Sequence, residues 1–103
     1  MWSKKEKDIA RRAFEIALEK ESLGLLSQLK EMAIAAENRE DIWRMHDFLT
    51  ERRKDIAQKY DFRYSVLLAV FSRLIREGWL GLDDLAGLAE DKIVKIKLMA
   101  GLE

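Results

Sequence analysis

Apolar and polar residues alternate with a helical period along most of this chain. From residue 3 to about residue 36, apolar side chains recur three or four positions apart, which is the spacing of one helix face. Ser3 followed by Glu6 is typical of a capping box at a helix start. Ser22 and Gly24 interrupt the pattern, so we expect either a long helix with a kink there or two helices joined there. Proline is absent, so helices should continue until a glycine or an Asx residue ends them.

A second helix is predicted from Asn38 to about Lys59. Asn38, with Asp41 three residues later, fits an N-cap. The helix carries a stripe with the 4-3-4-3-4 spacing of a heptad seam, and two of its members are polar. We call this stripe the α-seam; it consists of Ile42, His46, Leu49, Arg53, Ile56 and Tyr60. A helix of this kind cannot bury its stripe alone, so we expect a second copy or another partner to cover it.

A third helix is predicted over residues 62–77, with Asp61 as its N-cap and Gly78 just beyond its end. Within it, residues 66–75 are apolar on almost every side. A helix with this pattern must be covered by neighbours on several sides.

The last part of the chain predicts two more helices. Asp83 and Asp84 open a short helix that reaches about Leu88, and we interpret these acids as caps rather than as a catalytic pair of carboxylates. The final helix begins near Glu90, and its apolar side carries Ile93, Ile96 and Ala100. Its lysines are expected to face solvent, with contact to an acidic partner as the alternative: Lys92, Lys95 and Lys97.

Together these elements predict a single all-α domain over residues 1–103. A compact chain of this length has a radius of gyration near 13 Å, and the first two helices are too long for such a globule. We therefore expect an elongated helical stalk over residues 1–60, a small helical head over residues 61–103, and a dimer that covers the stalk.

Composition narrows the function. Lysine plus arginine and aspartate plus glutamate each number 19 among 103 residues, so no basic excess points to nucleic acid. The nearly apolar residues 66–75 are too short for a membrane helix, which needs about 20 residues, so no membrane insertion is expected. The absence of cysteine and of a recognisable signal peptide favours a cytoplasmic protein.

The usual catalytic constellations are poorly supported. His46 is the one histidine and no phosphate-binding glycine loop is present. A transition-metal site normally takes three or four ligands, whereas His46 and Asp47 are neighbours that point about 100° apart on a helix. We therefore expect no catalytic residue, no metal and no cofactor, and an enzyme is the least favoured class.

The polar members of the α-seam point instead to an interface. A polar residue in a seam costs stability unless it is paired, and its best-attested use is to fix register and partner. Trp43 and Asp47 form the adjoining ridge of the helix, and tryptophan and arginine are favoured at interface centres. Asp47 has three possible partners: Arg44 and Lys54 on the same helix, or Arg53 across an interface. A two-fold homodimer is the favoured reading, and a monomer with solvated charges is the alternative.

The same residues resemble the cyanobacterial fluorescence recovery protein family, whose hallmark is an acidic residue followed by (Leu or Ile)-Trp-x-(Leu or Met)-His-Asp-Phe-Leu. The matching block is Asp41-Ile42-Trp43-Arg44-Met45-His46-Asp47-Phe48-Leu49. The resemblance continues over most of the chain, through Arg52-Arg53, Lys59-Tyr60-Asp61, Arg63, Ser65-Val66-Leu67, Val70-Phe71, Glu77-Gly78 and Ala89-x-Asp91-Lys92.

The resemblance implies a regulator that is not an enzyme. Such proteins bind the photoactivated orange carotenoid protein, chiefly through its C-terminal domain. They promote its release from the phycobilisome at the thylakoid surface and speed its return to the resting orange form, which ends photoprotective quenching. The alternative is a dimeric helical module of the same family with another, unknown protein partner.

The resemblance also assigns residues. It places a dimer interface at Ile42, Trp43, His46, Asp47 and Arg53, the last four linked to activity, and we add Leu49 because it lies on the same stripe. Partner contact is expected at Asp47, Phe71 and Lys95. Two positions depart from the family pattern. Ala69 stands where a relative carries an aromatic residue in the head, and Gln58 replaces a glycine that often precedes Lys-Tyr, which favours a longer second helix here.

Overall fold

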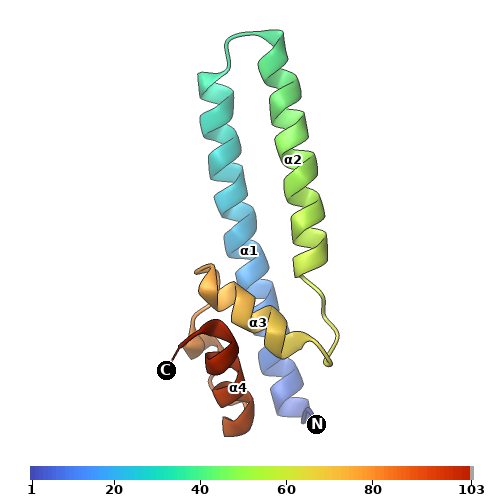
Figure 1. The fold of residues 1–103 in the computed structure, drawn as a ribbon, viewed down its shortest axis with the longest axis vertical. Helices are drawn as coiled ribbons and strands as arrows, with labels where there is room; N and C mark the ends of the chain where they lie inside the picture. Colours follow the sequence, from blue (N-terminus) through green and yellow to red (C-terminus); the bar gives the residue numbers. More distant parts are fainter. Residues whose placement is uncertain (103) are drawn as a thin grey trace.

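The computed structural model describes residues 1–102 and is all-helical over that range. Its elements are α1 (Lys4–Ala35), α2 (Arg39–Lys59), α3 (Leu67–Arg76), the short 3₁₀ helix η1 (Leu82–Leu85) and α4 (Glu90–Ala100). α1 and α2 form a long antiparallel hairpin, the stalk (Figure 1). The head consists of residues 60–102, and its helices gather around the lower part of α1. The predicted all-α stalk and head are confirmed.

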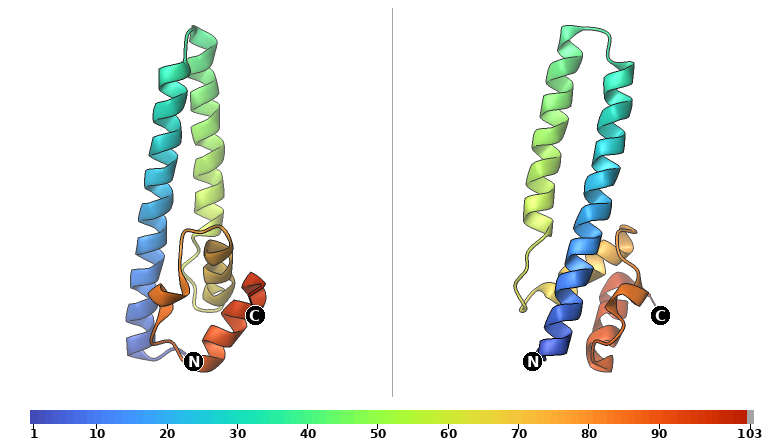
Figure 2. Two further views of the ribbon diagram at one scale, coloured as in Figure 1. Left: turned by 90° about the vertical axis from the view of Figure 1, so that its left-hand side faces the viewer. Right: turned by 180° about the vertical axis from the view of Figure 1, so that it is seen from behind.

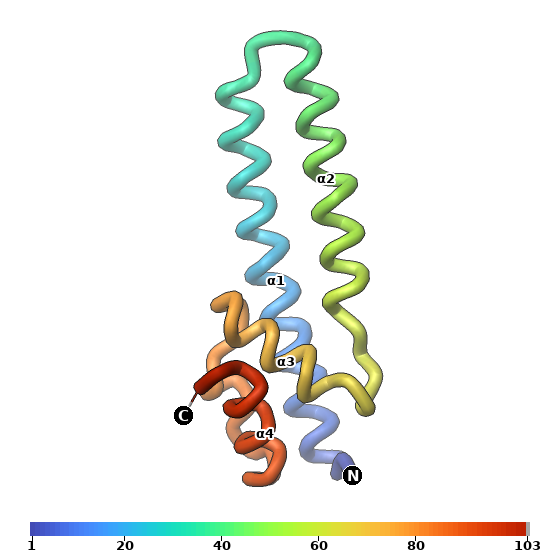
Figure 3. Tube along the Cα trace, in the orientation of Figure 1, coloured from blue at the N-terminus to red at the C-terminus, as the bar shows by residue number. Residues whose placement is uncertain are grey.

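α1 is one unbroken helix of 32 residues, about 48 Å long at ~1.5 Å per residue. The Ser3–Glu6 capping box is present: Ser3 Oγ accepts a hydrogen bond from the Glu6 amide and Glu6 Oε1 accepts one from the Ser3 amide. The alternative of two helices joined at Ser22 and Gly24 is wrong, and the trace passes smoothly through this point (Figure 3). Instead, the missing side chain of Gly24 lets the ring of Trp79 pack closely on α1, because a Cβ there would lie 2.9 Å from Cη2 of Trp79.

α2 begins as predicted. Asn38 is its N-cap: the side chain of Asn38 accepts a hydrogen bond from the Asp41 amide, and the Asp41 carboxylate accepts one from the Asn38 amide. The helix lies beside α1 along the stalk in all views (Figure 2). Its side toward α1 is half-buried and carries Asp41, Met45, Phe48, Arg52 and Ile56. Lys59 is the one fully buried residue of α2, so the two stalk helices pack loosely.

The predicted start of the third helix is wrong. α3 begins at Leu67, and Val66 caps it without a side-chain hydrogen bond. Asp61 does not cap the helix because its carboxylate pairs with Arg63, at 2.6 Å.

The chain between α2 and α3 instead packs its aromatic rings on α1. Phe14 meets Tyr60 and Phe62 edge to face, with ring centroids 5.3 and 5.0 Å apart, and Tyr64 follows Phe62 at 5.6 Å. Edge-to-face pairs are a favoured aromatic geometry. This packing holds residues 60–64 in a linker that passes over α1, and it outweighs their helical pattern.

The core lies where α1 passes through the head. Small residues of α1 let the head helices approach closely, and α3 is covered on several sides, as predicted. The fully buried core residues are Ala10, Ala13, Ala17, Leu67, Phe71, Leu74, Leu85 and Ile96. The lower turns of α1 therefore share the core of the head, and the two parts do not separate at residue 60.

α4 starts at Glu90 and buries Ile96 and Ala100, as predicted, but Lys92 does not face solvent. Its Nζ donates to Glu6 Oε2 at 3.0 Å and to the carbonyl of Met1 at 2.8 Å. The Glu6 carboxylate that caps α1 is buried in the head, and the ammonium group of Lys92 from α4 neutralises its charge there.

The short helix η1 ends at Leu85 rather than near Leu88. The amide of Gly81 donates to Asp84 Oδ2 at 3.0 Å, so the interpretation of this acid as a cap is confirmed.

The molecule is elongated, with extents of 53 × 25 × 18 Å. Its radius of gyration is 16.5 Å, against about 13 Å for a compact chain of this length. Among the described residues, none of the helices combines the length and the apolar character that crossing a membrane requires.

Candidate protein interface

The α-seam lies open along one flank of α2. Ile42 is 58% exposed and Leu49 36% exposed, and the side chains of His46 and Arg53 are exposed between and beyond them. Ile56 and Tyr60, nearer the head, are half-buried. The upper four members thus form an uncovered stripe that alternates apolar and polar side chains, and its arginine and the neighbouring tryptophan are residue types enriched at protein interfaces.

Trp43 stands on the outer side of α2 and is 63% exposed. Its ring meets that of His46 edge to face, with centroids 6.2 Å apart. An exposed tryptophan is unusual for a surface that stays in water, because its large apolar ring gains most from burial.

The charged residues beside the α-seam do not form the ion pairs with Asp47 that were possible within α2. Arg44 pairs with Asp41 at 3.2 Å and Lys54 with Glu51 at 3.6 Å, so neither binds Asp47. His46 Nδ1 lies 3.4 Å from Asp47 Oδ1, the one polar contact of that carboxylate within residues 1–102.

Arg53 has no ion pair or side-chain hydrogen bond among residues 1–102. The stripe therefore carries an exposed guanidinium six positions from the exposed carboxylate of Asp47. Arginine can grip a carboxylate in two places, so both charges are available to an incoming surface.

Asp41 fixes the start of this helix. The amides of Glu37 and Asn38 donate to its carboxylate and, with a smaller contribution from Arg44, hold the pKa of Asp41 below its usual value. A charged Asp41 at the N-terminus of α2 complements the helix dipole, which steadies the end of the stalk next to Ile42 and Trp43.

The two expected contact residues of the head lie in different environments. Lys95 is exposed on α4. Phe71 is fully buried in the core, so its ring does not itself touch a partner in this conformation, and it supports the head from within.

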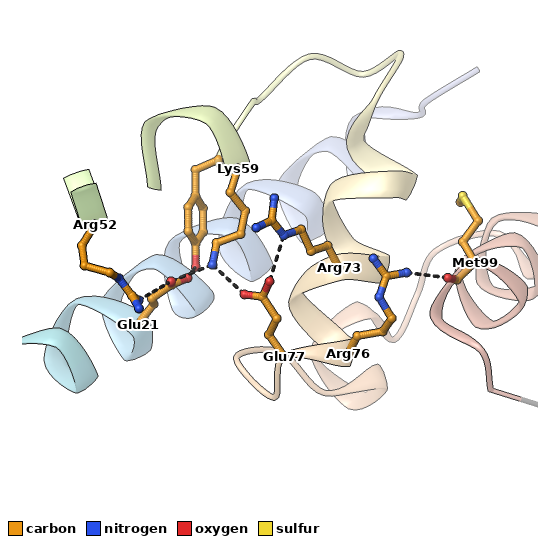
Figure 4. Close-up of polar contacts among 8 residues, drawn as sticks. Glu21, Arg52, Lys59, Arg73, Arg76, Glu77 and Met99 are labelled. Atoms are coloured by element: carbon orange, nitrogen blue, oxygen red, sulfur yellow. Dashed lines mark hydrogen bonds and ion pairs between the residues drawn. The ribbon is translucent and has the colours of Figure 1, made fainter. Parts of the chain in front are cut away.

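An ionic cluster at the base of the stalk was not foreseen from the sequence (Figure 4). Glu21 of α1 is buried and accepts from Lys59 at 2.6 Å, from Tyr60 at 2.8 Å and from Arg52 at 3.3 Å. Lys59 also donates to Glu77 of the head at 2.6 Å. The cluster joins α1, α2 and α3 at one point. Its signal in the sequence is an acid, Glu21, on the apolar stripe of the first helix.

The pKa values reflect this crowding. Burial raises the pKa of the Tyr60 phenol, and the hydrogen bond to Glu21 raises it further. Burial alone would raise the pKa of Glu77, but hydrogen bonds from Lys59 and Arg73 outweigh it and keep that pKa below its usual value. Tyr60 is therefore a neutral hydroxyl that donates its one hydrogen bond to the Glu21 carboxylate.

Within residues 1–102, no group of three or more His, Cys, Asp or Glu side chains is placed to hold a metal ion. His46 contacts Trp43 and Asp47, an arrangement that suits a hydrogen-bonding group at an interface.

An all-helical stalk with an open heptad stripe, joined to a head whose core includes the lower turns of α1, is typical of a small helical protein that binds other proteins. The family model described as "Photoprotection regulator fluorescence recovery protein" matches residues 2–100. The chain therefore belongs to the fluorescence recovery protein family, whose members are photoprotection regulators.

Individual relatives agree over nearly the whole length. The Fluorescence recovery protein of Synechocystis sp. is 40% identical over 101 residues, which is 98% of this chain and 93% of that protein. The solved structure of the Fremyella diplosiphon Fluorescence Recovery Protein is 43% identical with a TM-score of 0.91, and covers 99% of this chain and 100% of that one. The Synechocystis structure is 39% identical with a TM-score of 0.92 and the same coverage.

Proposed function

We propose that this protein is a cytoplasmic regulator that binds the photoactivated orange carotenoid protein through its C-terminal domain. It promotes release of that protein from the phycobilisome and speeds its return to the orange form. The observation that carries the proposal is the match to fluorescence recovery proteins over residues 2–100, which includes the whole Trp43–Leu49 block.

The working unit in this proposal is a homodimer built on the α-seam. An isologous two-fold interface makes each residue pair occur twice. If Asp47 of each protomer meets Arg53 of the other, the two α2 helices run antiparallel and the axis passes near Thr50. Such a dimer brings Ile42, Leu49 and Trp43 out of water and gives the two exposed charges a partner, which supports the proposal.

The head supplies the contact to the carotenoid protein. Lys95 is exposed on α4 and has no ion pair among residues 1–102, so its ammonium group is free to meet a carboxylate. Asp47 is assigned both to the dimer and to partner contact, because it lies on the outer side of the stripe, next to Trp43.

The mechanism we propose is differential binding. A scaffold that binds an intermediate between the open and closed carotenoid protein better than it binds the open form lowers the barrier to closing. This needs a rigid platform and no reacting group, which agrees with a surface that offers apolar, hydrogen-bonding and charged side chains.

The test is the dark decay of the red form of a purified orange carotenoid protein, followed by absorbance. The wild-type chain should speed the return to orange, and Lys95→Glu should weaken this effect while the dimer mass stays unchanged. Lys30→Glu, which reverses an exposed charge on the stalk, is the matched control and should behave as wild type. An unchanged decay rate with wild type would refute the proposal.

A different partner is the second candidate, favoured by one observation. Both departures from the family pattern, Gln58 and Ala69, line the same groove, between the end of α2 and α3. This candidate predicts that the wild-type chain forms the dimer but leaves the red-to-orange decay unchanged.

A further inference from the structure

The outer side of α4 carries an apolar surface that the fold does not use. Val94 is 47% exposed and Leu98 71% exposed, and they stand one turn apart, pointing away from the buried side of the helix at Ile96 and Ala100. Met99 and Leu102 extend the surface toward the end of the described chain and are also exposed. We call Val94, Leu98, Met99 and Leu102 the α4 patch.

The α4 patch is not needed for the core of the head. The inward face of α4 is already filled by Ile96 and Ala100, and α3 packs against it more extensively than any other pair of elements pack together. Polar residues at positions 94 and 98 would satisfy the fold equally well. Clustered exposed apolar residues on an otherwise charged surface are typical of interaction sites.

Three cations surround the α4 patch. Lys95 and Lys97 flank Leu98 on α4; Lys95 is exposed as predicted, whereas Lys97 is half-buried rather than facing solvent. Arg76 reaches over from α3, where it donates to the carbonyl of Met99 at 2.6 Å (Figure 4). None of the three has a carboxylate partner among residues 1–102. Cations near the end of a helix complement its dipole, and Arg76 does so at the end of α4 through the Met99 carbonyl, but it has no ion pair with a carboxylate among residues 1–102.

We infer that the α4 patch is the apolar centre of the partner-binding surface, and that it fits a protein surface with an apolar centre and carboxylates around it. The inference rests on the proposed function and deepens it, because it makes Lys95 part of the rim and Leu98 the centre. The surface is separate from the exposed members of the α-seam, Ile42 to Arg53, which lie on α2.

Charge decides between a partner and a second copy of this chain. Two α4 patches placed face to face would bring six cations against four carboxylates, from the exposed Glu90 and Asp91 of each copy, and the net positive charge on both surfaces opposes association. Asp91, exposed one turn before Val94 and Lys95, argues against an anionic membrane, since it would face the lipid headgroups. A protein surface with mixed charge around an apolar centre accommodates all of these groups.

The inference is tested by the affinity of Leu98→Gln for photoactivated orange carotenoid protein, measured by fluorescence anisotropy of a labelled chain. Removing the burial of one leucine side chain should weaken binding by about tenfold or more. Val94→Gln should weaken it in the same direction, and Lys97→Glu should lower the association rate, most strongly at low salt. Because Val94 and Leu98 are exposed, the melting temperatures of the two glutamine variants should stay within about 2 °C of wild type.

Ile34→Gln is the matched control, because it makes the same kind of change at a residue that is 86% exposed at the far end of the stalk. It should bind as wild type. If wild type binds and both Leu98→Gln and Val94→Gln bind equally well, the inference is overturned while the proposed function stands. If wild type itself does not bind, both the inference and the proposed function are refuted.

Two further outcomes would also overturn the inference. One is a lower oligomer mass of Leu98→Gln in light scattering with unchanged affinity for the carotenoid protein, which would make the patch a contact between copies. The other is sedimentation of wild type, but not of Leu98→Gln, with vesicles of phosphatidylglycerol and phosphatidylcholine, again with unchanged affinity.

Discussion

Glu6 shows what one carboxylate does in this fold. It accepts hydrogen bonds from the amides of Ala89 and Ser3 and from the ammonium of Lys92. These bonds, in that order of importance, lower the pKa of Glu6 to about 2. The residue thereby caps α1 and fixes the entry of the chain into α4 at the same time.

This environment predicts an acid-sensitive contribution to stability. The pKa of Glu6 is about 2 in the folded chain against an ordinary value of 4.5, so the stabilisation is complete above pH 4.5 and is lost as the pH falls toward 2. Glu6→Gln should be less stable than wild type at pH 7, and the difference between the two should shrink over that window. Urea midpoints measured from pH 7 to pH 2 check this, and a difference that stays constant with pH would contradict it.

Glu15→Gln is the matched control, since Glu15 is exposed on the same helix and has no hydrogen bond to lose among residues 1–102. Its midpoint should follow that of wild type at every pH.

At the scale of elements, much of the fold follows from local pattern. The caps at Ser3 and Asn38 and the periodic stripes behind them define α1 and α2, because capping and helical spacing are local properties. The start of α3 could not be predicted, since residues 60–64 pack on a helix that lies some 50 residues earlier in the sequence. The burial of Lys92 could not be predicted for the same reason, because its partner, Glu6, is 86 residues away in the sequence.

Part of the candidate interface also follows from the sequence, and part of it does not. The stripe from Ile42 to Arg53 is visible as a heptad pattern, and the structure leaves it exposed. The partners of Asp47 and the ionic cluster around Glu21 depend on how helices meet, which spacing along one helix does not give. A charged residue on an apolar stripe signals that a partner exists, but not which one.

Gly24 illustrates a contact between elements that can be tested. Replacing glycine by alanine inside a helix stabilises it by about 0.5–1 kcal/mol, but here the new Cβ would lie 2.9 Å from the ring of Trp79. Gly24→Ala should therefore stabilise the chain by about that amount in a Trp79→Leu background and by less, or not at all, in wild type. Urea unfolding of the four chains in this cycle gives the coupling, and equal effects of Gly24→Ala in both backgrounds would refute the contact.

At the scale of the whole molecule, the elongated shape leaves apolar surface of the stalk in contact with water. The stalk extends well beyond the core, and α2 contributes one fully buried residue along its 21 positions. Its exposed side carries Trp43 and the α-seam. Association is the simplest way to remove this apolar surface from water.

A substitution in the stripe tests the dimer. Ile42→Glu places a charge at a position that becomes buried on association, so we expect monomers at half the wild-type mass by light scattering, with helix content unchanged because Ile42 is exposed in the single chain. Gln58→Glu adds the same charge on another side of α2 and should remain dimeric. A wild-type monomer, or an Ile42→Glu dimer, would refute the interface.

The bond between Glu6 and Lys92 also bears on how the chain is made. During synthesis α1 emerges from the ribosome first, and α4 emerges last among the described helices. Until α4 has emerged, Glu6 lacks its ion-pair partner Lys92, and the apolar face of α1 around Phe14 is not yet covered by the head. The stalk hairpin is thus complete well before the core that anchors it, so folding of the native head waits for nearly the whole chain and leaves α1 in need of protection in the interval.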